Sequence, residues 1–150
     1  MSDGIHGHGT TLRVKLLTNT TAVSNYTTIG NVTTITGPGQ ARDPIDISTM
    51  DSTSKFREFI PGMSDAGEIT CELNYDGSAA GTANELLKGT YCGMMSTVTD
   101  LDWTITLPDT SKYSCNGFVT GLGHAIPFDD KVTQSLTIKL SGVPTYTDVA

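Results

Sequence analysis

The chain has 150 residues, a length typical of a single domain that buries enough apolar surface to fold without cross-links. A formal net charge of −7, with only 9 scattered Lys and Arg residues, argues against a protein that binds nucleic acid through its phosphates. No apolar stretch reaches the roughly 18 residues of a membrane-spanning helix. Abundant Thr and 16 Gly residues favour strands and turns over helices.

The chain begins with a segment rich in Gly and His that has no apolar period, and we expect a flexible arm over residues 1–10. The segment lacks a basic region followed by an apolar run, so we expect no secretory signal. His6 and His8 form an H-x-H pair that could contact a metal ion, but a solvated, Gly-rich arm is the simpler interpretation. Three widely spaced cysteines without a C-x-x-C pair predict reduced thiols rather than a zinc site. We therefore expect no cofactor and no metal.

Strands are predicted where apolar and polar residues alternate, because successive side chains of a strand point to opposite faces. The predicted strands cover residues 12–16, 31–36, 45–48, 68–75, 100–107, 113–126 and 135–140. The alternation is clearest over residues 101–107, where Trp103 takes an apolar position. Glycines within 113–126 predict bulges or close backbone approach. Gly142 and Pro144 are expected to begin a polar C-terminal arm over residues 142–150.

A short α-helix is predicted between the strands at 68–75 and 100–107. Apolar residues lie at helical spacing over residues 83–91, and Thr82 with Glu85 three positions later resembles a capping box. A helix this short must depend on packing against a sheet. The whole pattern predicts a mainly β fold, a sandwich or barrel of two packed sheets with one short α-helix and a long inter-strand loop.

The segment between the strands at 45–48 and 68–75 is the most informative part of the chain. Its Ser, Thr, Asp and Gly residues predict a long loop over residues 50–67, yet the loop carries much apolar material. Loops are normally polar because their backbone is solvated, and those beyond about 12 residues are usually functional or disordered. We therefore predict that another chain covers this loop, unless its aromatic cluster folds back as a satellite core. The predicted interface residues are Phe56, Arg57, Phe59, Ile60, Pro61 and Met63.

The sequence offers few residues that could converge into a catalytic site. It contains no G-x-S-x-G motif and no G-x-x-x-x-G-K phosphate-binding run. Glu68 and Glu72 could be imagined as an acid/base pair, but both belong to the polar face of a predicted strand. A solvated or channel-facing surface is the simpler interpretation, and we predict that the protein is not an enzyme.

Four segments carry a resemblance to a known family: IGNVTTITGPG, IDISTMDSTSKFREFIPGMSDAGEITCELNYD, ANELLKG and FVTGLGHAIPFDDKVTQSLTIKLSGVPTY. The last is the most telling, because a strand–turn–strand with P-x-D-D before an alternating run and a terminal S-G-x-P is characteristic of that family. On these residues the chain resembles, from end to end, the major tail tube proteins of long-tailed, non-contractile (lambda-type) bacteriophages. The N-terminal GIHGHG departs from the family pattern.

The resemblance implies a structural protein of the virion, made in the bacterial host cytoplasm, whose copies form six-fold rings stacked helically into a hollow tube. In that family a sheet from each subunit joins its neighbours into an inner barrel, and arms and long loops connect successive rings. Other tail proteins bind the tube ends, DNA passes the lumen without specific binding, and no membrane partner is expected.

Carried over to this chain, the resemblance gives a tube domain over residues 11–141 with arms at 1–10 and 142–150. The loop at 50–67, with the interface residues given above, would then connect the rings. A lumen with negative potential would repel DNA, and the acidic candidates for its lining are Glu68, Glu72, Asp100 and Asp102. Either polar strand face could point inward.

Two alternatives remain from the sequence alone. A tube subunit of a secretion or contractile apparatus would share the same fold logic. A carbohydrate-binding β-sandwich module would need exposed aromatic residues on a strand face, but the chain is only 7% aromatic and Trp103 lies in an apolar row.

Overall fold

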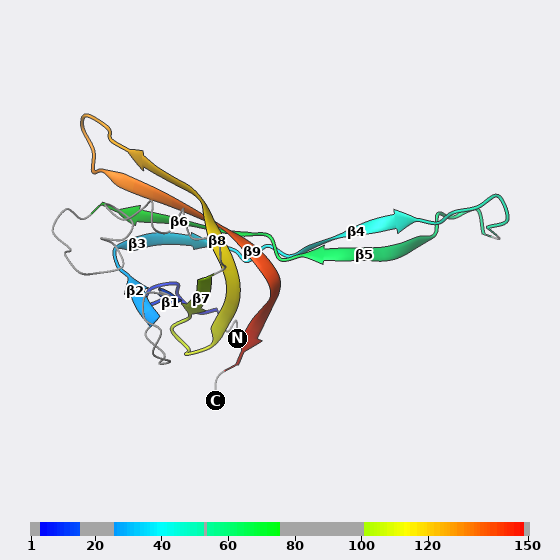
Figure 1. The fold of residues 1–150 in the computed structure, drawn as a ribbon, viewed down its shortest axis with the longest axis horizontal. Helices are drawn as coiled ribbons and strands as arrows, with labels where there is room; N and C mark the ends of the chain where they lie inside the picture. Colours follow the sequence, from blue (N-terminus) through cyan, green and yellow to red (C-terminus); the bar gives the residue numbers. More distant parts are fainter. Residues whose placement is uncertain (1–3, 16–25, 53, 76–100, 149–150) are drawn as a thin grey trace.

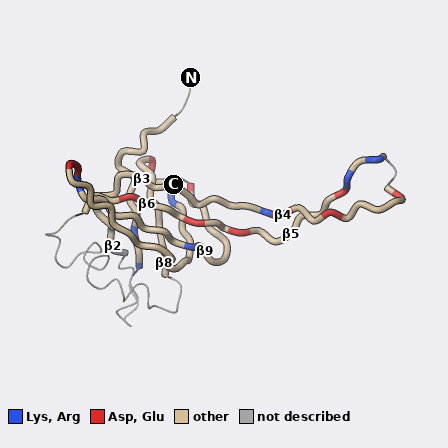
Figure 2. Tube along the Cα trace, turned by 90° about the horizontal axis from the view of Figure 1, so that it is seen from above, with Lys and Arg blue, Asp and Glu red and all other residues tan. Residues whose placement is uncertain are grey.

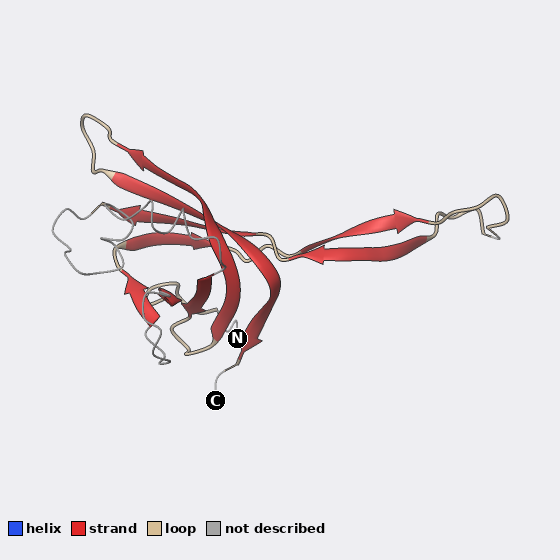
Figure 3. Ribbon diagram, viewed as in Figure 1, coloured by secondary structure: helices blue, strands red, loops and turns tan. Residues whose placement is uncertain are grey.

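The computed structural model describes residues 4–15, 26–52, 54–75 and 101–148 (Figure 1). Within these ranges the chain forms nine β-strands and no helix (Figure 3), so the predicted mainly β class is confirmed. The helix predicted over residues 83–91, with Thr82 and Glu85 at its start, lies outside the described residues. No helix able to span a membrane occurs in the part of the chain that the structure describes. The strands are β1 (Thr11–Lys15), β2 (Tyr26–Ile29), β3 (Val32–Thr36), β4 (Ala41–Asp46), β5 (Phe59–Asp65), β6 (Glu68–Asn74), β7 (Leu101–Thr106), β8 (Lys112–Ala125) and β9 (Thr133–Thr147).

Seven of these strands form one antiparallel sheet in the order β2-β1-β7-β8-β9-β6-β3, and β4 with β5 forms a separate hairpin. The strands β8 and β9 are long, and their two ends pair with different neighbouring strands. β6 pairs with residues 133–139 of β9, whereas β7 pairs with residues 112–117 of β8. We call β3, β6, residues 133–140 of β9 and residues 118–125 of β8 the first half-sheet. The second half-sheet consists of β2, β1, β7 and the remaining parts of β8 and β9.

The two half-sheets pack against each other around one apolar core. Side chains of β6 alternate between exposed and buried, so that Ile69, Cys71 and Leu73 point into the core. Trp103 of the second half-sheet is fully buried, and its Nε1 donates a hydrogen bond to the Gly117 carbonyl oxygen at 3.1 Å. Each such apolar side chain contributes about 1.5–3 kcal/mol through burial. Figure 1 shows β3 and β6 across from β1, β2 and β7, so the two layers of the sandwich are halves of one curled sheet.

The C-terminal part of the chain differs from the sequence prediction. Instead of a strand that stops near residue 140 and an arm from residue 142, β9 runs on to Thr147 and pairs with β8, as at Tyr113 and Tyr146. The strand passes Gly142, which has a φ of 80°, through a register shift, so that it bends rather than ends there. Two of the irregularities predicted at the glycines of β8 are confirmed: a register shift lies at Val119/Gly121, and a Cβ at Gly117 would collide with the Lys139 carbonyl oxygen. A further shift at Ser114/Asn116 was not predicted.

Candidate assembly surfaces

β4 and β5 form a hairpin arm, residues 41–65, that projects away from the seven-stranded sheet (Figure 1). The long loop predicted over residues 50–67 is therefore wrong in extent, because Phe59–Asp65 is a strand paired with Ala41–Asp46. The irregular part is limited to residues 47–58, which we call the distal loop. All residues of β4 are exposed. β5 lacks the apolar alternation that identifies a half-buried strand, and the strand predicted over residues 45–48 overlaps β4 only at Ile45 and Asp46.

The apolar side chains of the arm face solvent. The exposed fractions are 77% for Phe56, 50% for Phe59, 44% for Ile60 and 94% for Met63, and Arg57 and Pro61 are exposed as well. The alternative, in which the aromatic cluster folds back as a satellite core, is therefore wrong for a single copy of the chain. Three further exposed apolar residues of the arm were missed as interface candidates, namely Ile45, Ile47 and Met50. Ile45 and Ile47 marked the alternating strand predicted over residues 45–48, so the signal was present but was not interpreted as part of an interface.

Polar side chains fix the shape of the distal loop. Hydrogen bonds from the Ser48 hydroxyl and its backbone N–H hold the pKa of Asp46 below its ordinary value. The Glu58 N–H donates to the Ser48 Oγ at 2.8 Å, which closes the loop across its base. Lys55 has a φ of 58°, a left-handed conformation that residues other than Gly rarely adopt. The loop next to Phe56 is thus a defined turn rather than an extended strand.

Two prolines block both outer edges of the arm. The Ile47 N–H donates to the Glu58 carbonyl oxygen at 2.9 Å, and hydrogen-bonded and non-hydrogen-bonded pairs alternate along an antiparallel hairpin. The pair Pro44–Pro61, three positions from Ile47, is therefore non-hydrogen-bonded, and its backbone nitrogens point outward. Because proline has no N–H, neither edge can extend a sheet at this point. The arm is therefore built to make contacts through its faces.

The register of the hairpin assigns its side chains to two faces. Pro44 pairs with Pro61, Asp46 pairs with Phe59 two positions further on the same side, and Arg42 lies two positions from Pro44 in the other direction, next to a register shift. We call these five residues the proline face. The Arg42 Nε donates to the Ser64 Oγ at 2.8 Å, which holds the guanidinium along the hairpin. The opposite face carries the three isoleucines Ile45, Ile47 and Ile60.

The root of the arm is held by an ion pair and by close backbone packing. Lys139 Nζ lies 2.9 Å from Asp65 Oδ1 and 3.0 Å from Oδ2. The Gly67 N–H and then the Lys139 ammonium hold the pKa of Asp65 below its ordinary value. Gly67 has a φ of 80°, and a Cβ there would collide with the Gly39 backbone. These contacts join the arm to β9 and fix the point where the two strands of the arm leave the first half-sheet.

The predicted acidic residues do not form one surface. Glu68 and Glu72 lie on the outward face of β6, separated by Thr70, and both are exposed. Figure 2 shows how the acidic positions, in red, are distributed along the chain. Asp102 lies on β7 in the second half-sheet, where it pairs with Asn116 and Lys15. Period-2 alternation identifies the outward face of each strand but not which half-sheet the strand joins. Asp100 lies outside the described residues.

The turn between β8 and β9 forms a second exposed apolar surface. The sequence had predicted this segment only as a turn. We call residues 126–131 the β8–β9 tip. Ile126 is 76% exposed and the Phe128 side chain is fully exposed. β8 and β9 remain paired up to Ala125 and Thr133, immediately before and after the tip. An apolar–aromatic pair after a strand, IPF, is the sequence signal that could have identified it.

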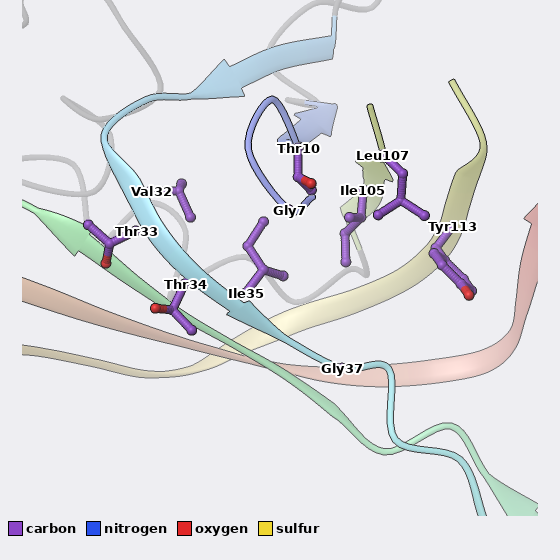
Figure 4. Close-up of a pocket in the computed structure, with 10 residues that line it drawn as sticks. All are labelled: Gly7, Thr10, Val32, Thr33, Thr34, Ile35, Gly37, Ile105, Leu107 and Tyr113. Atoms are coloured by element: carbon purple, nitrogen blue, oxygen red, sulfur yellow. The ribbon is translucent and has the colours of Figure 1, made fainter. Parts of the chain in front are cut away.

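Grouped side chains that could perform chemistry are absent from the described residues. Figure 4 shows a cleft of about 260 Å³ whose lining includes Ile35, Ile105 and Leu107, and among its ten labelled residues only Tyr113 is titratable. No group of three potential metal ligands occurs in the described part, which includes His6 and His8. Burial raises the pKa of Cys71 to about 12 and that of Cys115 to about 11. Both thiols therefore stay protonated and unreactive near neutral pH.

Comparisons with known proteins identify the family and the fold of this chain. The model of the family described as lambda phage tail tube protein matches residues 11–147. No curated protein matches the sequence significantly. The fold is similar to a chain from the tail of an empty gene transfer agent particle, with a TM-score of 0.73, 12% identity, and coverage of 96% of this chain and 99% of that chain. It is also similar to the SPP1 tail tube, with a TM-score of 0.66, 10% identity, and coverage of 97% and 80%.

A third similar structure is the sheath–tube complex of an extracellular contractile injection system, PVC. The TM-score is 0.70 at 17% identity, with 98% of this chain and 93% of that chain covered. At such identities the structural matches establish the fold alone. The match of the family model over residues 11–147 extends the argument from fold to family.

Proposed function

The chain belongs to the lambda phage tail tube protein family, and from this premise we propose that six copies close into a ring and that such rings stack into the tail tube. As a member of this family the protein is a structural subunit of the virion. The gene transfer agent tail, which shares the fold, has C6 symmetry, and this supports six copies per ring. Related folds in a tube-terminating cap and a baseplate support other tail proteins as partners at the tube ends. A structural role of this kind requires no catalytic group.

The observation that carries the proposal is a pair of open strand edges on the first half-sheet. Within the described residues, β3 and residues 118–125 of β8 each lack a partner strand on one side. Such edges present N–H and C=O groups that a strand of another chain can bond. We infer that β3 of one copy pairs with residues 118–125 of the next. Six first half-sheets would then form a closed inner barrel without free edges.

The positions of the prolines support this choice of edges. Residues 32–36 and 118–125 contain no proline. In contrast, the part of β9 beyond residue 140, which β6 does not pair with, carries Pro144. Both edges of the arm carry a proline as well. Edges that are not meant to pair are often blocked in this way.

The outward face of the first half-sheet would line the lumen. On β6 it presents Glu68, Thr70 and Glu72. β9 adds Ser135, Thr137 and Lys139 beside them, and Lys139 forms an ion pair with Asp65. Six copies would give a ring a formal charge of −42, six times −7. A polar, acidic wall repels phosphates, so DNA can pass without the many counterion-releasing contacts that a basic wall would make.

The arm would connect successive rings. Its exposed apolar residues Phe56, Phe59, Ile60 and Met63, with Arg57 and Pro61, have no cover within the described residues. The arm lies outside the sheet and is attached through a defined root, so it can reach a copy in another ring while its own ring stays closed. Covering this surface contributes about 25 cal/mol for each Å² of apolar area removed from water.

Electron microscopy of the purified protein over a concentration series tests the proposed function. Rings and tubes are expected, and a strict monomer at every concentration would contradict it. Hydrogen exchange on rings and monomers tests the edges. Amides of residues 32–36 and 118–125 should gain protection in the ring, whereas those of 141–147 should not. Equal gains on all three segments would refute the assigned edges.

Charge reversal tests the lumen assignment. We expect tubes of the Glu72→Lys variant to bind double-stranded DNA more tightly than wild-type tubes, and the gain to disappear as salt rises. The Asp148→Lys variant is a matched control, because it changes the ring charge equally at an exposed site near the end of β9. Equal DNA binding by both variants would exclude the outward face of β6 as the lumen wall.

A further inference from the structure

We propose that the β8–β9 tip of one copy docks on the proline face of the arm of a copy in the adjoining ring. The inference rests on the proposed stacking of rings and names the two surfaces that meet between them. The proline face consists of Arg42, Pro44, Asp46, Phe59 and Pro61.

The first step is the position of the two surfaces. The arm is attached where β3 ends at Thr36 and β6 begins at Glu68. At the other end of β6, the Tyr75 N–H donates to the Val132 carbonyl oxygen at 3.0 Å, next to the tip. Figure 1 shows the tip and the arm at opposite ends of the first half-sheet. Copies stacked head to tail need two different, complementary surfaces at opposite ends, and these two elements supply them.

The second step is the shape of the tip. Ile126 and Phe128 extend into solvent. The two strands that lead into the tip, β8 and β9, remain paired up to Ala125 and Thr133. The rings of Tyr75 and His124 pack edge to face at 5.8 Å beside the tip. An exposed aromatic side chain on a fixed support binds with little loss of conformational entropy. This is the arrangement expected of an anchor residue.

The third step is the chemistry of the receiving surface. The blocked edges of the arm exclude strand addition, so a partner must bind a face. Pro44, Pro61 and Phe59 offer an apolar platform for Ile126 and Phe128. Arg42, at one end of this platform, forms no ion pair within the described residues, where Lys139–Asp65 is the one salt bridge. The adjacent carboxylates of the tip, Asp129 and Asp130, supply the charge opposite to that of Arg42. The carboxylate of the face, Asp46, lies at its other end beside Phe59 and accepts a hydrogen bond from the Ser48 N–H.

The Phe128→Ser variant tests the docking. Because Phe128 is fully exposed, the variant should fold as the wild type does and still form rings. We expect the protein concentration needed for tubes to rise at least about tenfold, since one aromatic side chain per contact is no longer buried. Val143→Ser removes a similarly exposed apolar side chain from β9 and should assemble like the wild type. Tubes of the Phe128→Ser variant at wild-type concentrations would overturn the inference and leave the proposed function intact.

A charge exchange tests the receiving surface. The Asp129→Lys/Asp130→Lys variant should need a higher concentration to form tubes, and adding Arg42→Glu should lower that concentration again. Lys112→Glu, which reverses a charge at an exposed position of β8 instead, is the control and should give no rescue. Equal rescue by both, or none by Arg42→Glu, would exclude the proline face as the docking site. A wild-type protein that forms no tubes would instead defeat the proposed function itself.

Discussion

Removing the two aromatic side chains of the arm should abolish assembly and leave the fold intact. Phe56 and Phe59 are 77% and 50% exposed, and neither belongs to the core cluster. The Phe56→Ser/Phe59→Ser variant should therefore change the free energy of unfolding by less than about 0.5 kcal/mol. A core substitution such as Trp103→Ala should lower it by about 3–5 kcal/mol.

The expected loss of assembly follows from the same exposures. An aromatic side chain can bury about 200 Å², so these exposed fractions leave roughly 250 Å² for both side chains. At about 25 cal/mol per Å² this area is worth ~6 kcal/mol per arm, and ordering of side chains offsets part of it. Losing even half of this free energy would weaken the contact of the arm by more than about a hundredfold.

Circular dichroism and analytical ultracentrifugation separate these two effects. The variant should show a wild-type spectrum and unfolding transition, yet sediment without tubes. The Val143→Ser variant is the control, because that side chain is 89% exposed on β9, away from the arm. Loss of the folded state in the arm variant, or equal loss of tubes in the control, would refute the reasoning.

Three further predictions concern the arm root and the core. Gly67→Ala should destabilise the arm root by about 1 kcal/mol or more, because the φ of 80° disfavours Ala and its Cβ would meet the Gly39 backbone; chemical denaturation measures this. The pKa of Asp65 is lowered in the folded protein, so its contacts with Gly67 and Lys139 stabilise the fold fully above the ordinary pKa of 3.8. This stabilisation is lost as the pH falls through the lower pKa of the folded state. Hydrogen exchange of the Gly67 amide should therefore accelerate only in that acid range. Cys115, whose pKa is raised to about 11, should react with a thiol reagent at neutral pH only after unfolding, as mass spectrometry of the labelled peptide would detect.

Alternation predicted the strands that bury one face, because the core imposes period 2 on them. β6 and β7 are the clearest cases, and in both the apolar row faces the core. β5 was missed because it pairs with β4 but buries neither face against the other described elements, so no burial pattern marks it. Gly142 and Pro144 read as the end of a strand, but β9 accommodates them through a register shift and an unpaired edge.

The apolar residues of the predicted loop correctly indicated a segment whose apolar side chains are exposed in a single copy. Sequence spacing could not show that Phe59 and Pro61 share a face with Arg42, because that depends on the hairpin register. It also could not place Asp102 on a different half-sheet from Glu68, since long-range pairing decides this. Phe128 was overlooked because a turn sequence reveals its geometry but not its exposure.

A cryo-electron microscopy map of the assembled protein tests the central claim most directly. The account predicts six copies per ring, with residues 32–36 of each copy hydrogen-bonded to residues 118–125 of its neighbour in a closed barrel. A ring whose copies join through β2, through the arm edges or through residues 141–147, with β3 left unpaired, would contradict it.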